Sequence, residues 1–504
     1  MAAFVTDQFR ILNAGSFVES ISNNSYYAFL GLSNPTPASV GFGRLDDWNT
    51  SSTNNPVDNF QYLSHYRDTS LFGRKITSEN ARRVVKKIEW VQNDKYDMYR
   101  HDYRQDNLPS VSQSLRLYDA KYYIITSEFK VYICIENGTS GTNPTVPQST
   151  IEPTHTDVEP VLYSDKYKWK FLFKILPSDV IKFDSTEFLI VPNDWSTTTD
   201  SDIEIIREGG DSSINNNQIK TVYIEEGGQG YTNGFSANII GDGTGGQVSI
   251  TTDTNGKIIE VIVTQGGKGY TYGIVDLKDA GGVGSKLIPI IPPSKGHGSD
   301  IYTELGSDRV LLYARFDDST KDFPIDTKFS QVGIIKNPET FSENQVGTGV
   351  TFTGTEFSSL YSIALDSAVS VSIGDTITQD QDNGKVAKGY IASYDSETKV
   401  LKYYQDRSLY FGSVPPIDQR DNPNNIDVCP FVSDKPLSVG VITDFSGSVM
   451  TIDSKQINLG VTFSKGLANP EINKKTGDII YIDNRPIVQR DSRQKEDVKI
   501  ILEF

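Results

Sequence analysis

The sequence predicts a mainly β protein with a few short helices: a multi-domain framework, sandwich-like or barrel-like, that carries two inserted small antiparallel β domains. Segments rich in β-branched and aromatic residues alternate in polarity along most of the chain. Turn signals such as Asn255-Gly256 separate them, and a glycine-rich region contains an internal repeat. At 504 residues the chain exceeds the size of one hydrophobic core, so several domains are expected.

The first helix is expected near the N-terminus. Its apolar residues recur at helical spacing and predict one amphipathic stripe, made of Phe9, Leu12, Phe17 and Ile21. Thr6 or Asp7 is placed to cap its start.

Residues 78–90 (SENARRVVKKIEW) are the second helical candidate. The apolar residues expected to face a core are Val84, Val85, Ile88 and Val91. The basic residues of this segment are expected on a solvated helix face, and they are Arg82, Arg83, Lys86 and Lys87. A net charge of −17 opposes attraction to phosphates, so nucleic acid is not expected as a partner.

Two segments predict strands in the first half of the chain. Residues 121–136 are β-branched and aromatic with a polar break at 126–128, which predicts two short strands or one bent strand. Residues 167–175 (YKWKFLFKI) alternate strictly, with aromatic and lysine side chains on opposite faces. This alternation predicts a half-buried strand.

A glycine-rich domain is expected over residues 206–296. The segment TVYIEEGGQGYTNG at 221–234 recurs as EVIVTQGGKGYTYG at 260–273, so Tyr231 and Tyr270 correspond, 39 residues apart. Asn255-Gly256 between the copies predicts a hairpin with a type I′ turn.

A second small β domain, barrel-like in topology, is expected over 342–430. Turn signals at Asn383-Gly384 and Asp395-Ser396 separate its alternating segments. The framework is then expected in three parts, 1–205, 297–341 and 431–504.

No catalytic, metal-binding or cofactor-binding residues are predicted, and the chain is not expected to be an enzyme. Both glycine loops run GxGxxxG without a following lysine, which does not fit a phosphate loop. The four histidines have no metal-ligand spacing with one another or with cysteine. The sequence lacks a signal peptide and a stretch long enough to span a bilayer, so synthesis in a cytoplasm and no membrane partner are expected.

Two clusters are candidates for binding. Residues 96–103 mix aromatic and charged side chains, which is typical of protein interfaces and also of a buried aromatic corner; the interface candidates are Tyr96, Tyr99, Arg100 and Tyr103. The second cluster would stack on glycans if the chain were a carbohydrate-binding adhesin, and consists of Tyr231, Tyr270 and Tyr272.

The final segment, TGDIIYIDNRPIVQRDSRQKEDVKIILEF at 476–504, resembles the C-terminus of the baseplate wedge subunit family, the gene eight product, of T-even-like contractile-tailed phages. Similar segments recur in the same order along the chain: VTDQFRILNAGSFVESI at the start, FGRLDDW at 42–48, YKWKFLFKI, FLIVP at 188–192 and FSQVGIIKNP at 329–338. The two small β domains have no counterpart in the shorter family member, so they resemble insertions.

The resemblance implies a mostly β, homodimeric structural subunit of the virion that binds other wedge proteins at the periphery of the tail baseplate and rearranges when the tail contracts. It implies no catalytic residue and no cofactor. A carbohydrate-binding adhesin of the tail is the alternative.

The Asn484-Arg485-Pro486 run predicts a turn between a strand ending at Ile482 and a terminal strand over 498–504. In the packed interpretation, Arg485 bridges carboxylates bidentately. An ordinary hairpin with an exposed arginine is the alternative.

Overall fold

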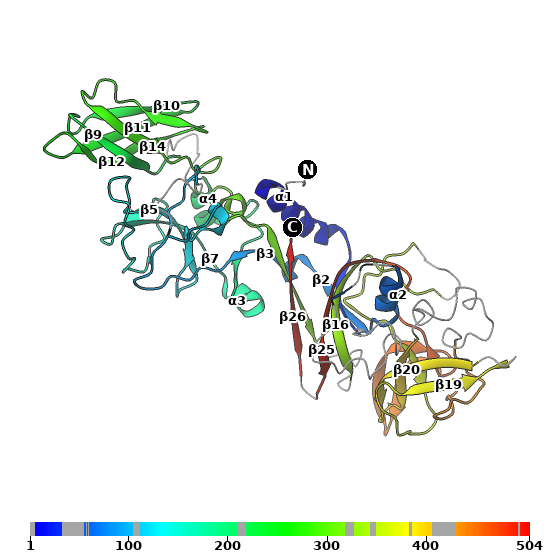
Figure 1. Ribbon diagram of the computed structural model, residues 1–504. Coiled ribbons are helices and arrows are strands. Elements are labelled where there is room, and N and C mark those ends of the chain that lie inside the picture. Colours follow the sequence, from blue (N-terminus) through cyan, green and yellow to red (C-terminus); the bar gives the residue numbers. More distant parts are fainter. Residues whose placement is uncertain are drawn as a thin grey trace. The chain divides into compact units, whose positions relative to one another are not determined.

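The computed structural model describes residues 6–32, 55–56, 58, 60–103, 111–208, 218–317, 327–342, 349–382, 386–405, 430–491 and 494–504. The chain forms two compact units (Figure 1). Unit 1 comprises Met1–Val18, Arg82–Leu311 and Ile501–Phe504, and unit 2 comprises Glu19–Ala81 and Leu312–Ile500. Both are mainly β with antiparallel sheets, which confirms the predicted fold class.

Helix α1 (Asp7–Asn23) confirms the predicted N-terminal helix, and the Thr6 hydroxyl caps it by accepting a hydrogen bond from the Phe9 amide over 3.3 Å. The predicted stripe was partly wrong, because Phe9 is 53% and Leu12 64% exposed whereas Ile11 and Ala14 are buried. The buried face combines Ile11 and Ile21 with the small residues Ala14 and Gly15. A Cβ at Gly15 would meet Nη2 of the Arg83 guanidinium at 2.1 Å, so close approach selects this face.

The predicted helix at 78–90 was wrong. A short 3₁₀ turn, η2 (Ser78–Asn80), leads into strand β3 (Ala81–Lys86), which pairs with β8 (Phe188–Val191). Adjacent β-branched Val84 and Val85 are both buried, which a strand covered on both faces permits. Val91, predicted to face the core, is 55% exposed.

The basic residues of this segment therefore lie on and after a strand and not on a helix face. The Arg82 guanidinium donates to both Asp179 carboxylate oxygens, over 3.0 and 2.9 Å. The Arg83 guanidinium lies 4.0 Å from the centre of the Tyr302 ring. Both arginines thus fix neighbouring elements.

A four-stranded sheet of order β4-β5-β7-β6 forms the centre of unit 1. Its strands are β4 (Tyr123–Ile125), β5 (Lys130–Asn137), β7 (Tyr167–Lys174) and β6 (Val161–Leu162). The antiparallel β4–β5 pair confirms the two short strands expected over 121–136. The half-buried interpretation of β7 was wrong, because Lys170 and Leu172 are buried along with the aromatic residues of the other face.

The other elements of unit 1 flank this sheet along the chain. They are η3 (Leu117–Asp119), α3 (Pro177–Phe183), α4 (Ser201–Glu208) and α5 (Ile301–Leu305). Strands β15 (Arg309–Phe316) and β26 (Glu496–Glu503) join β3 and β8 in a sheet of order β26-β15-β3-β8, and both continue into unit 2.

The glycine-rich region lies in unit 1 and is built from two reciprocally paired repeats. Its strands are β9 (Val222–Gln229), β10 (Ser236–Gly241), β11 (Thr244–Thr252), β12 (Ile258–Lys268), β13 (Gly273–Val275) and β14 (Val283–Pro289). β9 of the first repeat pairs with β14, and β11 pairs with β12 of the second. Gly227 pairs with Ser285, and Gly266 pairs with Gly246. Gly227 and Gly266 are 39 residues apart, as are Gly246 and Ser285, so the two ladders share one register.

Asn255-Gly256 does join β11 to β12, as predicted, but not through a type I′ turn. Of these two residues only Gly256 has a positive φ, 70°, whereas a type I′ turn requires both. The Asp253 carboxylate accepts from the amides of Asn255 and Lys257, and the longer turn ends in a bulge.

Unit 2 is organised around a five-stranded sheet of order β17-β2-β1-β16-β25. Its strands are β17 (Glu356–Ser358), β2 (Phe72–Ile76), β1 (Tyr26–Gly31), β16 (Lys328–Lys336) and β25 (Asp478–Gln489). Helix α2 (Phe60–Asp68) precedes β2 along the chain.

A second five-stranded sheet of unit 2, β19-β20-β21-β18-β24, contains most of the region predicted as the other small domain. Its strands are β18 (Tyr361–Ala364), β19 (Thr376–Asp380), β20 (Val386–Asp395), β21 (Val400–Tyr404) and β24 (Leu467–Ala468). β24 lies beyond the predicted boundary at residue 430, and β22 (Gly447–Ile452) and β23 (Lys455–Phe463) form a hairpin just before it. The Asp395-Ser396 turn is confirmed, and Asn383-Gly384 lies outside the described residues.

The predicted Asn484-Arg485-Pro486 turn was wrong. β25 continues through all three residues as the edge strand of its sheet and pairs with β16 (Figure 1). Proline lacks an amide donor, but an edge strand has one side without a partner and so tolerates it. The Arg485 side chain is 65% exposed and donates over 2.5 Å to a single carboxylate, that of Asp483, so it does not bridge two carboxylates.

Candidate functional site

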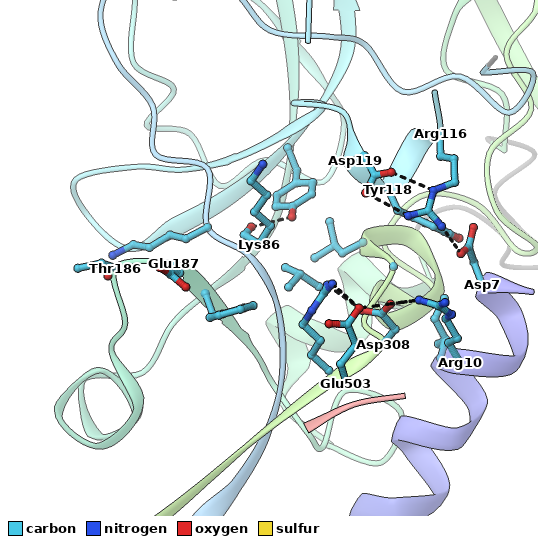
Figure 2. A pocket seen from close by; sticks show the side chains of 18 residues that line it. Asp7, Arg10, Lys86, Arg116, Tyr118, Asp119, Thr186, Glu187, Asp308 and Glu503 are labelled. Carbon is cyan, nitrogen blue, oxygen red and sulfur yellow. Dashed lines mark hydrogen bonds and ion pairs between the residues drawn. The ribbon is translucent and has the colours of Figure 1, made fainter. Parts of the chain in front are cut away.

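A charged groove of about 550 Å³ lies in unit 1, where α1, η3, the end of α5 and the end of β26 converge (Figure 2). Ten of its lining side chains carry charge: Asp7, Arg10, Lys86, Lys87, Arg116, Asp119, Glu187, Asp308, Arg309 and Glu503. Cations and anions are equal in number, so the groove has no net charge of its own.

Arg116 ties η3 to the first turn of α1. Its guanidinium donates to the carboxylates of Asp7 and Asp119, each over 2.9 Å (Figure 2). Asp7 also suits its position, because the N-terminal turn of a helix stabilises a negative charge. The contact is solvent-exposed, so it contributes more to placing α1 than to overall stability.

Asp308 and Glu503 share two arginines. The Arg309 guanidinium donates to both carboxylates, each over 2.9 Å, and Arg10 of α1 lies 3.9 Å from Asp308 and 3.8 Å from Glu503. Burial raises the pKa of Asp308, and Arg309 partly offsets this effect. The amide of the neighbouring residue, Phe504, donates to the Asp308 carbonyl over 3.2 Å.

An aromatic contact also joins helix α1 to the last residue of the chain. The Phe504 ring lies 5.3 Å from the ring of Phe17 on α1. Helix α1 is therefore held to the last residues of the chain by ion pairs on one side and by an aromatic pair on the other.

Most carboxylates of the groove are paired with arginines. The described lining of the groove contains no histidine, cysteine or serine, and the carboxylates of Asp308 and Glu503 are engaged by arginines. Within the described residues, no group of three or more His, Cys, Asp and Glu side chains is arranged to hold a metal ion.

The predicted interface cluster is a buried aromatic corner instead. Tyr96, Tyr99 and Arg100 are 0%, 6% and 6% exposed, and only Tyr103 is partly accessible. The Tyr96 hydroxyl accepts from the Val91 amide over 2.6 Å. Three of the four candidates are thus unavailable to a partner.

Arg100 has a defined internal role. It donates to both carboxylate oxygens of Asp102, over 2.9 and 2.8 Å, and its guanidinium lies 4.4 Å from the centre of the Tyr223 ring in β9. The Ile291 amide donates to the ring of His101 over 3.1 Å. These contacts fix both ends of the glycine-rich region to the neighbouring segment.

Two of the three tyrosines predicted to stack on glycans are also buried. Tyr231 is 7% exposed and its hydroxyl lies 2.6 Å from Ser285 Oγ. The Tyr270 hydroxyl accepts from the Gly246 amide over 3.0 Å and donates to the Ile239 carbonyl over 2.8 Å. The rings fill space left by glycines, because a Cβ at Gly282 or Gly243 would meet Tyr231 or Tyr270 at 2.4 Å. Tyr272 alone is exposed, at 62%.

At three places in the described chain, ionisable side chains that the sequence did not single out are buried. Lys170 on β7 is 2% exposed and donates to the Val158 carbonyl over 2.6 Å. In unit 1, His297 Nδ1 lies 2.5 Å from Glu304 Oε1. In unit 2, Arg490 donates to Glu496 over 2.7 Å. Charged residues are normally exposed, so no local sequence signal separates these from their solvated neighbours.

Comparison of the sequence with models of known protein families finds no match, and comparison with curated proteins finds none either. Among the helices of the described part of the chain, none has the length and apolarity needed to cross a lipid bilayer.

Proposed function

We propose that this chain is a structural assembly protein, held together by long-range contacts and acting through its surfaces. More specifically, we propose a subunit of the baseplate wedge in a contractile phage tail. The supporting observation is that segments resembling that family, although distant in sequence, contact one another within each unit.

The strand pair β16–β25 carries this argument in unit 2. It joins the segment at 329–338 to the final segment at 476–504, with Gly333 opposite Ile482 and Gln331 opposite Asn484. Gln331 is fully buried and donates from Nε2 to Asn484 Oδ1 over 2.8 Å. Two segments of the resemblance are therefore complementary in side chains as well as in backbone register.

Asn337 links the segment at 329–338 to residues 24 and 25, which follow shortly after the initial segment of the resemblance. It adopts a left-handed conformation with φ of 50°, which asparagine tolerates better than most residues. Its side chain accepts from the Ser25 amide over 2.8 Å and donates to Asn24 Oδ1 over 2.9 Å. In unit 1, the initial and final segments meet in the charged groove through Arg10 and Glu503.

In this proposal the chain acts as a homodimer, binds other wedge proteins and resides in the tail baseplate of the virion. Purified full-length protein should sediment as a dimer and co-purify with the neighbouring wedge proteins when these are co-expressed. A protein that stays monomeric at high concentration and ignores those proteins would contradict the proposal.

The alternative, a carbohydrate-binding adhesin, keeps one exposed aromatic candidate, Tyr272. A glycan array probed with the full-length protein and with Tyr272→Ala distinguishes it. Binding that depends on Tyr272 would favour the adhesin, whereas a blank array would count against it.

A further inference from the structure

Four apolar side chains are exposed close to one another along the chain path where β5 and β7 lead into α3 in unit 1. Phe129 is 39%, Leu176 63% and Ile181 80% exposed, and Pro177 is exposed between the last two. We call Phe129, Leu176, Pro177 and Ile181 the apolar ridge. Single exposed apolar residues need no explanation, but a cluster of this kind is typical of an interaction site.

Backbone contacts place these residues together. Lys130 pairs with Lys174 across β5 and β7, and the Ile175 amide donates to the Phe129 carbonyl over 2.9 Å. Leu176, the next residue, is the N-cap of α3. Pro177 and Ile181 are four positions apart on this helix and therefore share one face.

The conformation of Phe129 is a second, independent observation. This residue closes the turn between β4 and β5 with φ of 59°, a left-handed conformation that is unusual for an aromatic residue. Glycine or asparagine would occupy it with less strain. Strain of this kind often marks functional positions, and here it places a large ring at the protein surface.

The charges beside the apolar ridge indicate the chemistry of a partner. Glu128 is engaged by Lys130 over 2.8 Å, and Asp179 is engaged by Arg82. By contrast, Lys174 and Lys182 form no ion pair among the residues that the structure describes, although Lys174 acts at longer range with Lys130 to lower the pKa of Glu128. The unpaired charges at the edge of the apolar ridge are thus positive, on a chain whose net charge is −17.

We propose that the apolar ridge is a docking surface for a protein segment that presents apolar side chains flanked by carboxylates. The apolar ridge supplies the desolvated centre of the contact, and Lys174 and Lys182 supply the complementary rim. This proposal does not depend on the assignment to a phage tail.

Selection from a random-peptide display library on the immobilised full-length protein tests the proposal. We expect enrichment of peptides with apolar residues next to aspartate or glutamate. Phe129→Gly should weaken their binding by about tenfold or more, the loss expected for a central aromatic anchor. The same substitution relieves the left-handed backbone strain, so the variant should keep a single cooperative thermal transition, which separates lost binding from lost folding.

Two further variants sharpen the test. Lys174→Glu combined with Lys182→Glu should abolish binding of the acidic peptides, whereas Ile262→Ser, which removes an exposed apolar side chain elsewhere in unit 1, should leave it unchanged. Peptides without acidic residues, or equal binding to Phe129→Gly, would overturn the proposal. Self-association of the intact chain that Phe129→Gly abolishes would instead identify a second copy as the occupant and would also overturn it.

Discussion

Gln331 on β16 donates a hydrogen bond to Asn484 on β25 over 2.8 Å, across strands that pair residue by residue. The Gln331 side chain is fully buried, and its Oε1 has no hydrogen-bond partner among the residues that the structure describes. Its amide therefore depends on Asn484, a residue of the segment that resembles the wedge family.

Asn484→Ala should destabilise unit 2, because it leaves the buried Gln331 amide group without its acceptor. The expected loss is about 1–3 kcal/mol, measured as a fall in the thermal midpoint. The neighbouring Arg485→Ala is the matched control, since the side chain of Arg485 is 65% exposed. Equal effects of the two substitutions would contradict this interpretation of the strand pair.

The buried arginine near the end of the chain is Arg490, and its pair with Glu496 leads to a second prediction. The Arg490 side chain is 0% and the Glu496 side chain 8% exposed. Arg490→Ala should cost about 3–5 kcal/mol, because it leaves a buried carboxylate uncompensated.

The double substitution Arg490→Met with Glu496→Leu should recover most of that loss, because it removes both buried charges. Urea titration of the wild type, the single and the double variant measures this coupling. A double variant no more stable than Arg490→Ala would show that the two charges are not coupled.

The difference between Arg485 and Arg490 illustrates what the sequence left undetermined. Asn484-Arg485-Pro486 has the composition of a turn, and a proline normally argues against a strand. Only the sheet order, which places β25 at an edge, shows why the strand continues through Pro486. Burial of Arg490 likewise depends on its ion pair with Glu496, and only the folded structure shows that these two side chains meet.

The two tyrosines of the glycine-rich repeats should behave as structural residues. Tyr270→Phe leaves the Gly246 amide and the Ile239 carbonyl without a partner and should cost about 1–3 kcal/mol. Tyr231→Phe should cost less, because the hydroxyl and the amide of Ser285 that it releases are only partly buried. Hydrogen exchange of β11 and β14 measures both losses, and Tyr272→Phe serves as the exposed control.

Lys170 predicts a pH dependence. Burial lowers its pKa from 10.5 to about 8, and neighbouring Lys220 acts in the same direction while Glu304 and Glu159 oppose it. Between these two pH values the unfolded chain holds a proton that the folded chain has released, so the contribution of Lys170 to stability should rise with pH.

The test compares the wild type with Lys170→Met. The wild-type thermal midpoint should gain relative to the variant as the pH increases from 8 to 10.5. If the thermal midpoints of the two proteins changed in parallel with pH, the lowered pKa of Lys170 would be contradicted, whatever the absolute stability of the variant.

The sequence predicted helices and strands well where its apolar residues recurred at one clear spacing, either that of a helix or that of a strand. The β4–β5 hairpin, the paired repeats and the helix capped by Thr6 follow from local composition and spacing. Residues 78–90 were misassigned because Val84, Val85 and Ile88 fit a buried strand as well as a helical face, and tertiary pairing with β8 decided between them. The aromatic cluster at Tyr96 and Tyr99 had the composition of an interface, but burial depends on the sheet beneath it and not on composition.

The most direct test of the central proposal is a cryo-electron-microscopy reconstruction of the contractile tail to which we propose that this chain belongs. We expect density for a pair of copies in each baseplate wedge, with β16 and β25 side by side as described. A complete baseplate without the chain, or the chain located elsewhere in the particle, would contradict the assignment.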